Sequence, residues 1–332
     1  MQTRLLPSHA IAEAADLLQS GELVAFPTET VYGLGARVFD KHAIQAVFEA
    51  KGRPSDNPLI VHCADIQDLG MLVEPLTGRL RQLFSVLYDT FCPGPLTFVL
   101  PKKHNVPDSV TSGLQTVAVR FPAHPIAQEL IHAVGEPLVA PSANRSGYPS
   151  PTCARHVLDD LEGRIAAVID GGQCTLGIES TVVNFLCQPP VILRPGSITH
   201  EQLNRVVNAY GYEPFVDMSN IQHLETDIPC APGMKYRHYA PYAPVMPAVT
   251  EQEALELAQR YAPALILARS EYLRCNLPDA VQMQELSEQR LYAALRYADR
   301  EGKRAVVVLL DEEVRRRHTA LVNRVMKAAS SL

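Results

Sequence analysis

The stretch Lys51-Gly52-Arg53-Pro54-Ser55-Asp56-Asn57-Pro58-Leu59 is the most informative part of the amino-acid sequence. Its two prolines fix the backbone angle φ and bias the residues before them toward extended geometry. Side chains two apart share one face of an extended chain, so Lys51 and Arg53 present two cations together, with Asn57 as a polar partner. This arrangement suits a polyphosphate. Taken alone, however, the segment slightly favours an ordinary solvated loop over a phosphate site, because basic residues are also common at the C-terminus of a helix.

Short apolar runs that end in a polar residue recur beyond this stretch. Residues 59–61 lead into His62, and residues 117–119 lead into Arg120. Such runs predict buried strands of an α/β or α+β sheet. Four further runs end in the same way, at Ser142 and Asn144, at Asp170, at Asn184 and at Arg194. Open α/β sheets bind ligands at strand ends, although a strand end is also where a chain ordinarily meets solvent.

The chain has 332 residues, which is more than a single hydrophobic core usually supports, so we expect two domains. We predict a first domain over residues 1–212, a proline-rich linker or lid over residues 213–247, and a small C-terminal α/β domain over residues 248–332. In the last part, helices at 250–261, 287–301 and 314–329 alternate with strands at 264–268 and 304–310, which predicts a mainly parallel, Rossmann-like sheet. Residues 33–35 lack the third glycine of a dinucleotide motif and are predicted to form a turn.

Charge and composition exclude several classes of protein. The formal net charge is −6, and residues 1–245 carry 17 basic and 24 acidic side chains, which disfavours a dedicated nucleic-acid binder. No run of about 18 apolar residues occurs, so we expect no membrane span and a cytoplasmic protein. The seven cysteines form no C-x-x-C pair, which favours buried thiols over disulfides or structural zinc.

Seven motifs occur together, in the order PTETVYGLG at 27–35, KGRPSDNPL at 51–59, PGPLT at 93–97, VRFP at 119–122, APSAN at 140–144, ESTV at 179–182 and RPG at 194–196. As a set they resemble the threonylcarbamoyl-AMP synthase family with a YrdC-like catalytic domain, over roughly residues 9–200. Residues 231–241 and the pair Asn323-Arg324 resemble the longer, two-domain form of that family.

The resemblance implies a twisted, mixed sheet with a concave, positively lined binding face. It implies an enzyme that condenses L-threonine, bicarbonate or CO2, and ATP to threonylcarbamoyl-adenylate and pyrophosphate. The product would feed threonylcarbamoyladenosine modification of tRNA beside the anticodon, through downstream transferase proteins and with at most a weak direct tRNA contact. Mg²⁺ would accompany the ATP phosphates without metal ligands from protein side chains, and no organic cofactor is implied.

The resemblance also assigns residues by motif position. Lys51 and Arg53 would be the catalytic residues. The ATP-binding set would be Lys51, Arg53, Asn57, Thr116, Ser142, Asn144, Ser150, Arg194 and, as a lid from the linker, Tyr236. The threonine-binding set would be Thr30, Tyr32, His62, Arg120, Ala140 and Ser180.

Three other interpretations remain open at this point. A concave basic face could hold RNA or tRNA without chemistry. A carbamoyl-adenylate enzyme of the hydrogenase-maturation kind shares this type of domain, but the length and cysteine spacing leave no room for its acylphosphatase and zinc-finger regions. The C-terminal unit shows no catalytic motif, so we expect a structural or partner-docking role for it.

Overall fold

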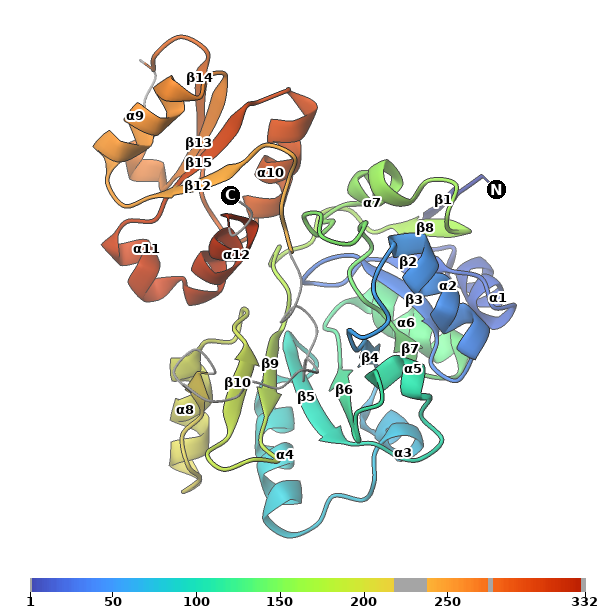
Figure 1. Ribbon diagram of the computed structural model, residues 1–332. Coiled ribbons are helices and arrows are strands. Elements are labelled where there is room, and N and C mark those ends of the chain that lie inside the picture. Colours follow the sequence, from blue (N-terminus) through green and yellow to red (C-terminus); the bar gives the residue numbers. More distant parts are fainter. Residues whose placement is uncertain (1, 218–237, 274–276, 330–332) are drawn as a thin grey trace.

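A computed structural model describes residues 2–217, 238–273 and 277–329. It shows a large first domain and a smaller second domain that packs against it through helices α10 (Leu291–Arg300) and α12 (Thr319–Ala329) (Figure 1). Tyr236 and most of the predicted lid lie outside the described residues. Within the described ranges, no helix combines the length and apolarity needed to cross a bilayer.

The first domain is built on one mixed sheet with the strand order β1-β8-β2-β3-β7-β4-β6-β5-β9-β10-β11. Its strands are β1 (Arg4–Pro7), β2 (Val24–Phe26), β3 (Gly33–Arg37), β4 (Ile60–His62), β5 (Leu96–Pro101), β6 (Thr116–Arg120), β7 (Leu138–Val139), β8 (Ala167–Asp170), β9 (Thr181–Asn184), β10 (Val191–Arg194) and β11 (Val216–Asp217). The strand pairs β4–β6 and β5–β9 are parallel, whereas β5–β6 and β9–β10 are antiparallel. The mixed sheet is therefore confirmed.

Helices cover this sheet and are set by ordinary local signals. They are α1 (Ile11–Gln19), α2 (Lys41–Lys51), α3 (Leu69–Leu72), α4 (Gly78–Phe91), α5 (Asp108–Thr111), α6 (Pro125–Val134), α7 (Ala154–Leu161) and α8 (His200–Ala209), with a 3-10 turn at Ile66–Asp68. The side chains of α1 and α6 share one apolar cluster, and those of α2, α4, α7 and α8 share another. Asp40 caps the start of α2, and Gly52 ends it in the left-handed region, so Lys51 is fixed at a helix end.

The second domain has a fully parallel sheet with the strand order β12-β15-β13-β14. Its strands are β12 (Val245–Ala248), β13 (Ala264–Ala268), β14 (Val281–Glu285) and β15 (Ala305–Leu309), and its further helices are α9 (Glu251–Arg260) and α11 (Glu312–Arg317), with a 3-10 turn at Ser270–Tyr272. Strands β13 and β15 are buried along their whole length, as expected for a parallel sheet between helices. The predicted small α/β domain is confirmed.

Two local predictions are wrong. Residues 33–35 form the start of strand β3, not a turn. A side chain at Gly35 would lie 2.9 Å from the ring of Phe26, so glycine is needed for β3 to pair closely with β2. The final helix is interrupted at His318 and divides into α11 and α12.

Candidate active site

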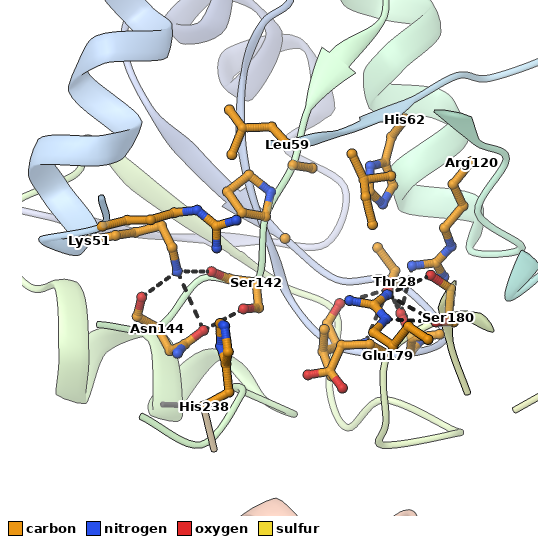
Figure 2. A pocket seen from close by; sticks show the side chains of 18 of the residues that line it. Thr28, Lys51, Leu59, His62, Arg120, Ser142, Asn144, Glu179, Ser180 and His238 are labelled. Carbon is orange, nitrogen blue, oxygen red and sulfur yellow. Dashed lines mark hydrogen bonds between the residues drawn. The ribbon is translucent and has the colours of Figure 1, made fainter. Parts of the chain in front are cut away.

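A polar pocket lies where the ends of several strands meet (Figure 2). Strand β4 ends at His62, β6 at Arg120 and β10 at Arg194, and all three residues line the pocket. The pocket is completed by the end of α2 and the loop that follows it, by the loops after β2 and β7 and before β9, and by His238 and Tyr239. Its lining residues are Thr28, Thr30, Val31, Gly33, Lys51, Arg53, Pro58, Leu59, Ile60, His62, Arg120, Ala140, Pro141, Ser142, Asn144, Ser146, Gly147, Glu179, Ser180, Arg194, His238 and Tyr239.

Lys51 lies at one end of the pocket and is almost fully buried, with 3 % of its surface exposed. Its Nζ donates to the backbone oxygen of Ser142, to the backbone oxygen of Asn144 at 2.6 Å and to Asn144 Oδ1 at 3.5 Å. The lysine thereby ties helix α2 to the turn that follows β7. Burial and the nearby Arg53 hold its pKa well below the usual lysine value, and the opposing effect of Asp160 is too small to offset them.

The extended geometry expected for residues 51–53 is wrong. Helix α2 continues through Lys51, and Gly52 has a φ of 60°, so Lys51 and Arg53 do not share a face by strand-like alternation. They nevertheless both line the pocket, because the chain reverses at Gly52. Arg53 Nη2 donates to the backbone oxygens of Asn57 at 3.2 Å and Pro58 at 3.0 Å, which fixes the guanidinium beside the loop.

Arg120 lies at the other end of the pocket and is also buried. Its Nη1 donates to Thr30 Oγ1 at 2.8 Å, and its Nη2 lies 2.7 Å from Glu29 Oε1 in an ion pair. Burial and the positive charge of Arg120 lower the pKa of His62 to about 3, so this imidazole is neutral at physiological pH. The arrangement offers a fork for a carboxylate beside a neutral imidazole.

Glu179 connects the pocket to the second domain. Its carboxylate accepts hydrogen bonds from Ser150 Oγ at 2.5 Å, from Tyr292 Oη of α10 at 2.8 Å and from Arg324 Nε of α12 at 2.7 Å. Burial alone would raise the pKa of Glu179, but Arg324, Arg194 and the Ser150 hydroxyl together lower it to about 2. The second domain therefore helps to set the shape of the pocket.

The neighbouring residue, Ser180, is held by a different arginine. Arg194 donates to the backbone oxygen of Ser180 from both Nε, at 3.1 Å, and Nη2, at 3.0 Å. Close by, Gly196 packs against the same segment, and a side chain there would lie 2.3 Å from the backbone nitrogen of Thr181. Only glycine allows this approach.

Most of the residues assigned from the sequence meet in this pocket. Ten of them line it: Thr30, Lys51, Arg53, His62, Arg120, Ala140, Ser142, Asn144, Ser180 and Arg194. Four others do not. Asn57 is buried in the loop between α2 and β4. Thr116 starts strand β6, at the end opposite Arg120, and Ser150 donates to Glu179. The hydroxyl of Tyr32 donates to the backbone oxygen of Gly172 at 2.8 Å, away from the pocket.

Sequence reasoning missed some of the residues that shape the pocket. Glu179 belongs to the quoted motif at 179–182, yet its role depends on Tyr292 and Arg324, which are far away in the chain. His238 and Tyr239 belong to the quoted segment at 231–241 and line the pocket, where Tyr239 stacks on Tyr292 with ring centroids 5.4 Å apart. The motifs themselves were the available signal.

The buried histidines predict how the fold responds to acid. The pKa of His62 is lowered to about 3, that of His156 to about 4 and that of His238 to about 3, each chiefly by burial. Their contribution to stability is complete above the unfolded value of about 6.5 and is lost as the pH falls toward 4. The free energy of unfolding of His62→Gln, measured in urea, should therefore fall less steeply with acid than that of the wild type. The difference should be about 1.4 kcal/mol for each pH unit below 6.5. His9→Gln, at an exposed position, should leave the slope unchanged, and an equal slope in both variants would contradict the assignment.

Comparison with known proteins identifies the family of this chain. Residues 16–196 match the Sua5, YciO and YrdC family described as telomere recombination, and residues 198–330 match the family described as threonylcarbamoyl-AMP synthase, C-terminal domain. The threonylcarbamoyl-AMP synthase of Pyrococcus abyssi is 42% identical over 329 residues, which cover 95% of this chain and 93% of that protein. The enzyme of that name from Bacillus subtilis is 51% identical over 239 residues, covering 71% of this chain and 65% of that protein.

A solved structure resembles the whole chain. The crystal structure of P. abyssi Sua5 complexed with L-threonine matches with a TM-score of 0.86 and 38% identity, covering 99% of this chain and 98% of that one. Both domains are therefore shared with a relative of known structure. The chain belongs to the threonylcarbamoyl-AMP synthase family of nucleotidyltransferases, in its two-domain form.

Proposed function

We propose that this chain condenses L-threonine, bicarbonate or CO2, and ATP to threonylcarbamoyl-adenylate, with release of pyrophosphate. The observation that carries the proposal is the division of one pocket into a polyphosphate end at Lys51 and Arg53 and a carboxylate end at Arg120. The ends face each other across a single cavity, so both substrates can be held together (Figure 2). Holding two reactants in one geometry removes much of the entropic barrier to their condensation.

The reaction divides into two steps. The amine of threonine adds to CO2 and loses a proton to give a carbamate. A carbamate oxygen then attacks the α-phosphorus of ATP, the bond to the β-phosphate oxygen breaks, and pyrophosphate leaves. Arg120 would hold the threonine carboxylate, while Lys51 and Arg53 would hold the phosphates on which negative charge develops. No residue of the pocket has to act as a covalent nucleophile.

Magnesium would be bound through the nucleotide. Among the described residues, no group of three or more His, Cys, Asp or Glu side chains is arranged to hold a metal ion. The pocket carboxylate of Glu179 is occupied by Ser150, Tyr292 and Arg324. The pocket residues therefore fit a magnesium ion that binds as a complex with ATP. Phosphate oxygens would be its main ligands, and it would neutralise charge on the triphosphate.

The product is a mixed anhydride that water would hydrolyse readily, so its fate depends on how well the pocket excludes water. We assign its use to a transferase that places the threonylcarbamoyl group on the adenosine beside the anticodon of tRNA. The acidic excess of residues 1–245 is consistent with at most a weak direct contact with tRNA.

Pyrophosphate release tests this function directly. With ATP, Mg²⁺ and bicarbonate present, L-threonine should stimulate release strongly, and L-serine, which lacks the methyl group, should do so about tenfold less. No stimulation by any amino acid would contradict the proposal. A tRNA-binding module without chemistry would instead shift tRNA in a gel titration and release no pyrophosphate.

A further inference from the structure

A buried carboxylate lies beside Arg120 but outside the pocket. Glu29 is in the loop after β2, and its side chain is 9% exposed. The adjacent residues Thr28 and Thr30 line the pocket, whereas Glu29 does not. The Glu29 carboxylate therefore meets the Arg120 guanidinium, with Oε1 2.7 Å from Nη2, without itself lining the cavity.

This ion pair dominates the surroundings of both groups. Neither Glu29 oxygen has a directed hydrogen bond to another of the described residues. Arg120 keeps its orientation through Thr30 Oγ1 at 2.8 Å and the backbone oxygen of Gly94 at 3.4 Å. Arg120 is thus the ion-pair partner of Glu29 among the described residues, and the opposite charges of this pair offset each other.

The opposite end of the pocket is not balanced in this way. Lys51 is just as buried, but its hydrogen-bond partners are the oxygens of Ser142 and Asn144. Among the described residues no carboxylate lies within ion-pair distance of it, and the charge of Asp160 acts on it only from further away. Figure 2 shows Lys51 and Arg120 at opposite ends of the same cavity. One cavity therefore contains a cation with a direct carboxylate partner, Arg120, and a cation that Asp160 influences only without a direct ion pair, Lys51.

This difference determines which anion each end prefers. A buried cation without a counter-charge attracts a polyanion strongly, whereas a cation paired with a carboxylate gains much less from it, because the carboxylate repels the additional charge. A zwitterion of zero net charge does not suffer this repulsion, since its ammonium group is attracted by the same carboxylate.

We infer that Glu29 is a specificity-determining residue that keeps pyrophosphate and the nucleotide phosphates away from Arg120 and reserves that end for an amino-acid zwitterion. The inference rests on the proposed function and adds to it the reason why the two substrates do not exchange places. Glu29 acts through Arg120, so it is a positioning residue and need not touch substrate.

Glu29→Gln tests this role, because glutamine keeps the shape and removes the charge. The apparent Kd of L-threonine is measured by calorimetry on the full chain, with increasing pyrophosphate and without ATP. In the wild-type protein, pyrophosphate should leave the Kd of threonine nearly unchanged. In Glu29→Gln, pyrophosphate should compete and raise the apparent Kd of threonine by about tenfold.

Matched variants separate charge from structure. Glu29→Asp keeps the charge and should exclude pyrophosphate as the wild type does, and Glu162→Gln, exposed on the same domain, should do likewise. If Glu29→Gln does not fold, Glu29→Met supplies a neutral side chain of similar volume, and the same competition is expected of it.

A Glu29→Gln protein that binds threonine independently of pyrophosphate would overturn the inference, even if threonine binding were weaker, because a purely structural role predicts that result. A wild-type protein that binds no L-threonine would instead overturn the proposed function.

Discussion

Replacing Lys51 by methionine should lower adenylate formation by about 100-fold or more, the loss typical of removing one preorganised group that stabilises developing charge. Methionine fills a similar volume but cannot donate to the backbone oxygens of Ser142 and Asn144 or neutralise a phosphate. Pyrophosphate release under saturating threonine measures the rate, and nucleotide binding by calorimetry shows how much of the loss arises in the ground state.

The fold should survive this change. Burial holds the pKa of Lys51 well below its usual value, which shows that burying this cation is unfavourable. Removing it relieves that desolvation penalty, and this offsets the loss of its hydrogen bonds to the turn after β7. Lys41→Met, at the exposed start of the same helix, is the matched control and should keep full activity. A Lys51→Met enzyme with the rate of the control would show that the polyphosphate end has been placed wrongly.

Replacing Arg324 by methionine should destabilise the protein by about 3–5 kcal/mol, because it leaves the buried carboxylate of Glu179 without its counter-charge. Urea unfolding of the full chain gives this free energy. Activity should fall as well, since Arg324 and Tyr292 hold the Glu179 carboxylate that lines the pocket.

A double-mutant cycle separates pairing from simple loss of packing. Glu179→Gln combined with Arg324→Met should recover much of the stability lost in Arg324→Met alone, because no buried charge then remains unpaired. Arg316→Met, on the exposed surface of α11, should change stability by less than about 0.5 kcal/mol. Losses in the single variants that simply add would contradict the coupling between the two domains.

Local sequence patterns are sufficient to predict much of the sheet and most of the residues that line the pocket. The apolar runs before His62 and Arg120 are strands β4 and β6, and both polar residues line one cavity, since parallel neighbours end at the same edge. The sequence does not predict strand β14, because glutamine and glutamate interrupt the continuous apolar run that marks the other strands of this domain. Strand β3 is not predicted because two glycines in three residues are typical of a turn, whereas here they allow close pairing with β2.

The contacts that shape the pocket were harder to predict, because they join distant parts of the chain. Lys51 meets Ser142 across 91 positions, and Arg324 meets Glu179 across 145. Spacing along the sequence contains no information about such pairs unless the whole topology is known. The motifs therefore indicate which residues matter, and only the fold shows that Glu29 pairs with Arg120 and Glu179 with Arg324.

The apolar cluster of the second domain extends across the boundary to include Val31 and Ile178 of the first. A protein consisting of the large sheet alone would present both side chains to water, at a cost of about 1.5–3 kcal/mol each. An ancestor or an engineered fragment without the smaller unit would therefore gain from polar replacements at these two positions. Residues on one side of a domain boundary can in this way reveal whether a second unit evolved alongside them.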